Sequence, residues 1–153
     1  AFPLETVIST PFRQFRGLSW SPDGEKLACV LIGSLGKSSA DPLDQRVVVY
    51  WPDSSRAPVS TSHALATWVS ADHLVYVELP AITGAPSRVW LMNVLTQERT
   101  LLLYAAEPVT SLTWVGERGK LCVWSTSDYV RDGKFQPART RGWLVEIDGL
   151  PAD

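Results

Sequence analysis

The sequence is poor in the residues that most often bind metals or form covalent cross-links. It has two cysteines, Cys29 and Cys122, and two histidines, His63 and His73, in 153 residues. Two cysteines are too few for the disulfide framework of a small secreted domain, and two histidines offer little to a zinc site. We therefore expect no metal and no cofactor, and we expect both cysteines to act as small buried hydrophobic residues.

An excess of positive charge is also lacking. The chain carries 14 lysine and arginine residues against 16 aspartate and glutamate residues, which gives a net charge of -2. A chain without a positive field of its own is poorly suited to hold a nucleic acid or an anionic membrane surface. We expect neither as a partner.

Long apolar runs are absent too. The longest uninterrupted runs, such as LLLYAA at 101–106, are far shorter than the roughly 20 residues of a membrane-spanning helix, so no membrane span is predicted. The chain begins at Ala1 without a leader pattern, which fits a processed chain, an excised fragment or a numbering of its own. We expect a soluble chain, and the sequence leaves its compartment open, the periplasm and the cell exterior included.

Catalytic motifs are missing as well. The sequence contains no GxSxG nucleophile elbow, no HExxH metal motif and no glycine-rich phosphate loop. By strand order, His63 and His73 fall on opposite faces of one repeat, so they do not form a pair for acid–base chemistry. We expect no catalytic residue in this chain.

What the sequence does have is an internal repeat, which is best preserved in its first copy, GLSWSPDGEKLACV at residues 17–30. The second copy is ALATWVSADHLVYVE at 64–78, and the third is SLTWVGERGKLCVWS at 111–125. Trp20, Trp68 and Trp114 mark the register at spacings of 48 and 46 residues. A repeat of this length indicates an array of similar structural units.

A second apolar segment follows each copy of the repeat: RVVVYWPDSS at 46–55, RVWLMNVLTQ at 88–97 and GWLVEIDGLP at 142–151. These segments align so that Val48, Trp90 and Trp143 occupy one equivalent position. The runs are short, rich in Val, Leu, Tyr and Trp, and bounded by Pro, Gly, Asp and Ser, which is typical of strands. SPDG at 21–24 predicts a tight turn, because Pro22 presets φ near -65° and Gly24 adopts conformations that other residues resist.

The predicted strands fall into three groups. The first group lies at 17–20, 26–32, 46–51 and 57–61, the second at 64–68, 73–79, 88–94 and 99–103, and the third at 110–114, 120–125 and 142–148. One further strand is predicted at 5–10, before the first group. The sequence therefore predicts an all-β fold of three repeats.

The stretch SWSPDGEKLACV followed by VVVYWP resembles the TolB-type, WD-like β-propeller repeat, which also occurs in the propellers of prolyl oligopeptidase-type peptidases. The first copy matches the motif best, and the other two copies follow by internal similarity. The resemblance implies four-stranded antiparallel blades around a central channel. Blade one spans about 17–61, blade two about 64–103 and blade three about 110–148.

In this arrangement blade three lacks its fourth strand, and the strand at 5–10 has no blade of its own. Three blades alone leave long sheet edges and exposed apolar faces. We therefore expect a β-propeller segment that is completed in one of two ways. Either a second copy supplies the missing strand from its residues 5–10 in a homo-oligomer, or the segment belongs to a larger chain or complex.

Three long connections, at 33–45, 80–87 and 126–140, are expected on one face of the propeller, and such loops usually form the binding face of a repeat protein. The third is the preferred site for a protein partner, because basic and aromatic residues alternate in it. The candidate residues are Tyr129, Arg131, Lys134, Phe135, Arg139 and Arg141. The alternative is a solvated loop whose arginines pair with nearby carboxylates.

Five tryptophans at repeat-equivalent positions are expected to pack between neighbouring blades: Trp20, Trp68, Trp114, Trp90 and Trp143. The function we expect is a non-catalytic binding or assembly scaffold that acts through the long-loop face. Two alternatives stay open. One is the substrate-gating propeller of a prolyl oligopeptidase-type serine peptidase, and the other is a small oligomeric lectin.

Overall fold

The computed structural model describes residues 14–32, 45–61, 65–78, 86–105, 109–131 and 134–150. In these ranges the chain consists of β-strands joined by turns, with one short 3-10 turn at Gly116–Arg118. The all-β prediction is confirmed. The described ranges contain no helix with the length and apolar character of a membrane span.

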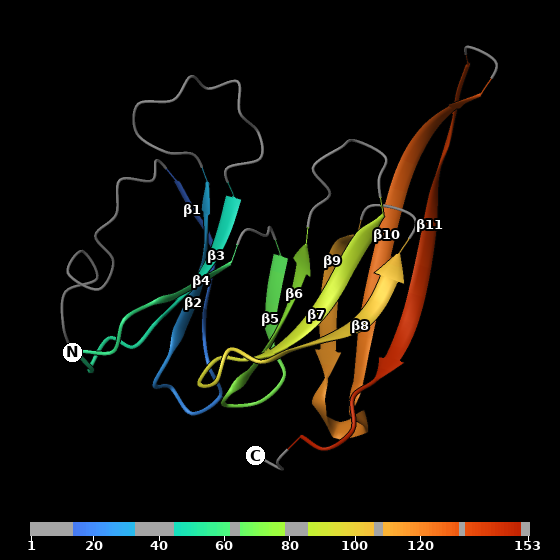
Figure 1. The fold of residues 1–153 in the computed structure, drawn as a ribbon. Coiled ribbons are helices and arrows are strands. Elements are labelled where there is room, and N and C mark those ends of the chain that lie inside the picture. Colours follow the sequence, from blue (N-terminus) through green and yellow to red (C-terminus); the bar gives the residue numbers. More distant parts are fainter. Residues whose placement is uncertain are drawn as a thin grey trace.

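The strands form three antiparallel sheets, called here sheets A, B and C (Figure 1). Sheet A has the order β1 (Gln14–Trp20), β2 (Leu27–Ile32), β3 (Gln45–Tyr50) and β4 (Val59–Thr61). Sheet B has the order β5 (Leu65–Trp68), β6 (His73–Glu78), β7 (Ser87–Asn93) and β8 (Arg99–Ala105). Sheet C consists of β9 (Val109–Val115), β10 (Lys120–Arg131) and β11 (Lys134–Glu146).

Each strand predicted between residues 17 and 148 overlaps an observed strand. The strand predicted at 5–10 lies outside the described residues. One prediction was wrong: β10 and β11 continue through most of 126–140, where a loop was expected. The physical reason is that Tyr129, Val130 and Phe135 favour extended backbone and flank Asp132–Gly133, a dipeptide that favours hairpin turns.

The strand register agrees with the alignment of the three repeats. The tryptophan of each repeat pairs with the first leucine of the next strand. The second aligned position pairs with the residue two places after that leucine. The pairs are Trp20 with Leu27, Trp68 with Leu74, Trp114 with Leu121, Cys29 with Val48, Tyr76 with Trp90, and Val123 with Trp143. The repeats are therefore equivalent in backbone pairing as well as in sequence.

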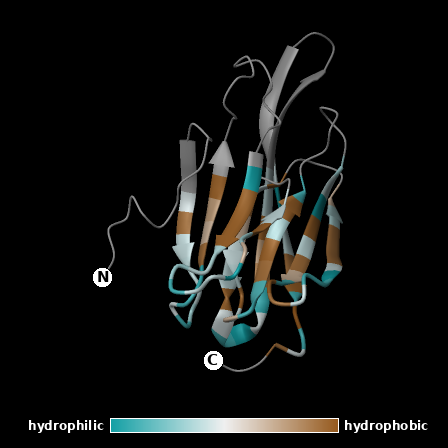
Figure 2. Ribbon diagram, turned by 60° about the vertical axis from the view of Figure 1, so that its left-hand side comes forward, coloured by the Kyte–Doolittle hydropathy of each residue, from teal (hydrophilic) through white to brown (hydrophobic). Residues whose placement is uncertain are grey.

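One apolar core lies between sheets A and B and another between sheets B and C. The first joins Ala28, Val30, Val47, Val49 and Val59 to Trp68, Leu74, Tyr76, Met92 and Val94. The second joins Val69, Val75, Val77, Val89 and Ala105 to Val109, Leu121, Val123 and Ile147. Figure 2 shows the hydrophobic residues concentrated in the strands and the hydrophilic residues at their lower turns.

Strand β6 shows how one short segment serves both cores. Successive side chains of a strand point to opposite faces, so Leu74 and Tyr76 pack toward sheet A while Val75 and Val77 pack toward sheet C. All four side chains are 0% exposed. The continuous apolar run LVYV is thus the sequence of a strand covered on both faces.

The SPDG segment forms the predicted turn. The backbone N–H of Gly24 donates to the carbonyl of Ser21 at 2.9 Å, and Gly24 has φ 73°. Only glycine adopts that left-handed conformation at little cost. The Ser21 N–H in turn donates to the carbonyl of Lys26 at 2.8 Å, which fixes the entry into β2.

Candidate functional site

Five of the six predicted partner-binding residues, all except Arg141, belong to a two-stranded arm that extends from sheet C (Figure 1). The pairing of β10 with β9 ends at Ser125, whereas its pairing with β11 continues to Arg131 and Lys134. Residues 126–131 and 134–140 therefore form a hairpin without a third strand among the described residues. We call this segment the sheet C arm.

The register of the arm brings some of the predicted residues together and separates others. Arg131 is paired directly with Lys134, and Tyr129 is paired with Gln136. Phe135 pairs with Val130 and Arg139 with Ser127. Of the six predicted residues only Arg141 has a described side chain; it is exposed and lies beside Ser125 in the sheet itself.

A buried lysine that the sequence did not single out joins sheets A and B. Lys26 is 2% exposed, and its Nζ lies 2.8 Å from Asp23 Oδ2 and 3.1 Å from Asp72 Oδ1. Asp23 belongs to the turn between β1 and β2, and Asp72 to the turn between β5 and β6. A buried ammonium group needs such partners, because an unpaired charge away from water is strongly unfavourable.

The same contacts determine the charge states of these groups. Burial by itself would raise the pKa of Asp23, but hydrogen bonds from Lys26, Ser21 and the Glu25 N–H outweigh that effect and lower the pKa to about 2. Burial would lower the pKa of Lys26, and its hydrogen bonds to Asp23 and Asp72 raise it instead. The contact is therefore an ion pair at neutral pH.

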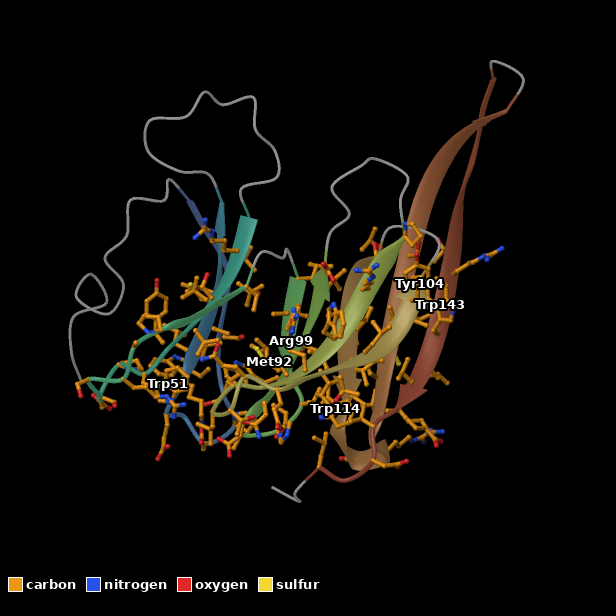
Figure 3. The ribbon with its side chains drawn as sticks, in the orientation of Figure 1. Trp51, Met92, Arg99, Tyr104, Trp114 and Trp143 are labelled. Atoms are coloured by element: carbon orange, nitrogen blue, oxygen red, sulfur yellow. The ribbon has the colours of Figure 1, made fainter. Side chains whose placement is uncertain are left out.

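A second polar group lies on the face of sheet B that is directed toward sheet A (Figure 3). Trp90 Nε1 donates to Glu78 at 2.7 Å, and the Arg99 guanidinium lies 4.9 Å from the centre of the Trp90 ring. Arg99 also donates to the Tyr76 hydroxyl at 3.1 Å, and Arg88 lies 3.9 Å from Glu78. These side chains are therefore partners of one another beside the A–B core.

Four of the five repeat-equivalent tryptophans pack against the cores between the sheets. Trp68 is 8% exposed, and its Nε1 donates to the Ser19 carbonyl of sheet A at 3.2 Å. Trp90 packs against the A–B core, and Trp114 and Trp143 pack against the B–C core (Figure 3). Trp20 differs, because it is 49% exposed.

Two tryptophans outside the aligned positions have different surroundings. Trp51 packs against the A–B core, with the Arg56 guanidinium 4.5 Å from its ring centre. Trp124 is 44% exposed on the outer face of sheet C. Its ring lies close to Gly142, where a Cβ atom would come within 2.7 Å of the ring, so the glycine is needed for this placement.

The described residues offer no cluster of three or more His, Cys, Asp and Glu side chains that fits a metal ion. Both cysteines are free thiols. Cys29 is 1% exposed, and burial raises the pKa of its thiol to about 11, so it stays protonated. Cys122 is partly exposed, unlike the buried residue expected from the sequence.

No protein-family model matches the chain, and no curated protein matches it either.

Proposed function

We propose that the chain is a non-catalytic scaffold, a β-propeller segment whose three sheets are consecutive blades, and that it binds a protein partner through the sheet C arm. The observation that carries the binding role is the arm itself. The pairing of β10 with β9 ends at Ser125, but β10 stays paired with β11 as far as Arg131 and Lys134. A sheet has no need of such an extension for its own core.

The blade interpretation is supported by the stacking of the sheets. The three sheets share one register, and apolar cores join each sheet to the next. Cα atoms of β5 come within 8 Å of those of β1, β2 and β9, so the first strands of the sheets lie near one another. Propeller blades converge in this way on their innermost strands.

The chemistry of the arm favours an acidic protein segment as the partner. Arg131, Lys134 and Arg139 outnumber Asp128 and Asp132 in this segment, and the strand register pairs the two basic residues Arg131 and Lys134. A two-stranded hairpin also leaves backbone N–H and C=O groups on its outer edges, which an extended partner segment can pair with.

The test is to shorten the arm without disturbing sheet C. Ser125 and Arg141 are directly paired, so joining them through Asn-Gly in place of residues 126–140 closes the hairpin with a favourable two-residue turn. Wild-type and shortened chains are immobilised, and proteins retained from an extract are compared by quantitative mass spectrometry. A retained protein is then titrated against both chains.

We expect affinity to fall by about tenfold or more in the shortened chain and in the variant carrying R131E, K134E and R139E. The matched control is Arg118→Glu, which changes an exposed basic residue in the turn at the other end of sheet C. The proposal fails if the shortened and triple-substituted chains bind the same proteins as tightly as the wild type while the melting temperatures agree.

A further inference from the structure

The outer face of sheet C, which is directed away from sheet B, is apolar and exposed. Leu144 is 67% exposed and Trp124 is 44% exposed, and Cys122, paired with Leu144, lies on the same face. We call Cys122, Trp124 and Leu144 the trailing face. Large exposed apolar patches on a folded protein usually mark an interaction surface.

The repeat shows what normally covers these positions. Trp124 is equivalent to Val30 in sheet A and Val77 in sheet B, which are 7% and 0% exposed against the following sheet. Leu144 is equivalent to Val49, which is 1% exposed in the A–B core. In sheets A and B, therefore, the next sheet covers this face.

In the described part of the chain, the outer face of sheet A lacks the preceding sheet that covers the same face in sheets B and C. On it, Trp20 and Leu18 are each 49% exposed. The equivalent Trp68 is buried against the preceding sheet, where it donates to the carbonyl of Ser19. We call Leu18 and Trp20 the leading face. On the same side of sheet A, Cys29 and Val48 are buried, so the exposed part of this face lies along β1.

We propose that the trailing face of one chain docks on the leading face of a second copy, in the geometry that already joins sheet A to sheet B and sheet B to sheet C. This inference rests on the blade arrangement of the proposed function and adds the surface through which the scaffold assembles. The leading Trp20 takes the place that Trp68 takes within the chain, and its Nε1 donates to the Thr113 carbonyl of the other copy.

Charge complementarity supports this docking. In the A–B contact, Lys26 precedes the first leucine of β2 and meets Asp72, which lies two residues before the corresponding Leu74. The equivalent residues at the proposed contact are Lys120 on the trailing side and Glu25 on the leading side. Both are at least partly exposed. Lys120 lies 3.6 Å from the exposed Glu146, a contact that it can exchange for Glu25.

A second copy is the occupant that the repeat favours, because the chain carries both halves of the contact. Each copy presents one trailing and one leading face, so two copies satisfy all four faces through two identical head-to-tail contacts. The result is a ring of six sheets, within the usual range of about four to eight propeller blades. No partner of different structure is needed to cover either face.

The first measurement is the molar mass of the 153-residue chain in solution by light scattering during size-exclusion chromatography. At about 100 µM we expect twice the chain mass of 16.9 kDa. Leu144→Glu and Trp20→Glu, which change opposite faces, should each shift the mass to that of the monomer. Tyr104→Glu is the control, because Tyr104 is 57% exposed on β8, outside both faces, and this variant should stay dimeric.

A mixing experiment tests the head-to-tail geometry. The Leu144→Glu chain retains an intact leading face and the Trp20→Glu chain an intact trailing face, so their mixture should regain part of the dimer that neither forms alone.

A charge reversal tests the contact between Lys120 and Glu25. Lys120→Glu and Glu25→Lys should each weaken the dimer about threefold to tenfold, and the double variant should recover it. Recovery distinguishes a contact between these residues from damage to the fold.

Three outcomes overturn the inference. The first is a wild-type monomer at about 100 µM. The second is a dimer that both Leu144→Glu and Trp20→Glu leave intact. The third is a dimer that Leu144→Glu abolishes but Trp20→Glu does not, because that result means that two trailing faces meet each other. Failure of this test leaves the partner-binding test of the sheet C arm unaffected, because shortening the arm removes none of the residues of either face.

Discussion

Sheet B and the two sheets beside it are built from the same repeat but differ in how they are covered. Sheet B packs against a neighbour on both faces, and the side chains of Leu74, Val75, Tyr76 and Val77 are fully buried. Sheets A and C each have a described neighbour on one face only, and large apolar side chains are exposed on their other faces. At the tryptophan of the first strand, therefore, burial depends on the neighbouring sheet and not on pairing within the sheet.

The tryptophans of the first strands make the comparison concrete. Trp20 and Trp68 have the same register with respect to the following leucine, yet one is 49% exposed and the other 8%. Their local sequences are similar, so the neighbouring sheet accounts for the difference. A residue of this kind stabilises the contact between sheets and contributes little to its own sheet.

The largest expected effect is therefore at Trp68. Replacing this side chain with alanine leaves a cavity between sheets A and B and removes the hydrogen bond to Ser19, and we expect a loss of about 3–5 kcal/mol in the free energy of unfolding. The same change at Trp20 should cost about 1 kcal/mol or less in the monomer, because that ring is already half in water. Chemical denaturation at low protein concentration measures both values.

If Trp68→Ala does not fold, Trp68→Phe keeps most of the core filled and should still cost more than Trp20→Phe. Equal losses at the two positions would contradict the conclusion that the neighbouring sheet sets the contribution of this tryptophan.

The second prediction compares two lysines at the same position of the repeat. Lys26 is buried between sheets A and B, whereas Lys120 in sheet C is 39% exposed. Lys26→Met removes the cation that holds Asp23 and Asp72 together, and we expect a cost of about 1–3 kcal/mol, moderated because both carboxylates are partly exposed. Lys120→Met should stay within about 0.5 kcal/mol of the wild type.

Thermal unfolding of both variants at neutral pH and low protein concentration checks this prediction. A Lys26→Met chain as stable as the wild type would mean that the ion pair does no more than offset the cost of burying its charges.

The sequence predicted the strands and their register well, and for a physical reason. Alternation of apolar residues and turn residues such as Pro22 and Gly24 are local signals, and the three repeats confirm one another. It predicted burial less well. The exposure of Trp20 depends on whether a sheet packs against β1, and the sequence of one repeat does not indicate which sheets lie beside it.

The two other failures have different causes. The loop predicted at 126–140 was wrong because the repeat alignment ends the second strand at 125, whereas Tyr129, Val130 and Phe135 around the hairpin signal Asp132–Gly133 favour continued strands. Lys26 was missed because a lysine in a polar turn is usually solvated. Its burial depends on Asp72 in the next repeat, a contact that only the stacking of the sheets creates.

The smallest predicted effect is the contribution of Asp23 to stability at low pH. Its pKa in the folded chain is about 2, below the ordinary value of 3.8, so the folded state binds its proton less readily than the unfolded state. The resulting stabilisation is complete above about pH 4 and is lost as the pH falls toward 2. Since the side chain is 30% exposed, solvent screens the contact, and we expect about 1 kcal/mol at most.

Urea unfolding between pH 2 and pH 5 measures this contribution as the slope of the unfolding free energy with pH. The slope should be shallower in Asp23→Asn than in the wild type, because the unfolded state of the variant no longer takes up this proton. Glu117→Gln is the matched control: Glu117 is the equivalent residue of sheet C and is exposed, so its replacement should leave the slope nearly unchanged. An equal change of slope in both variants would contradict this prediction. It would mean that the ion pair of Asp23 affects the pH dependence of stability no more than an exposed carboxylate does.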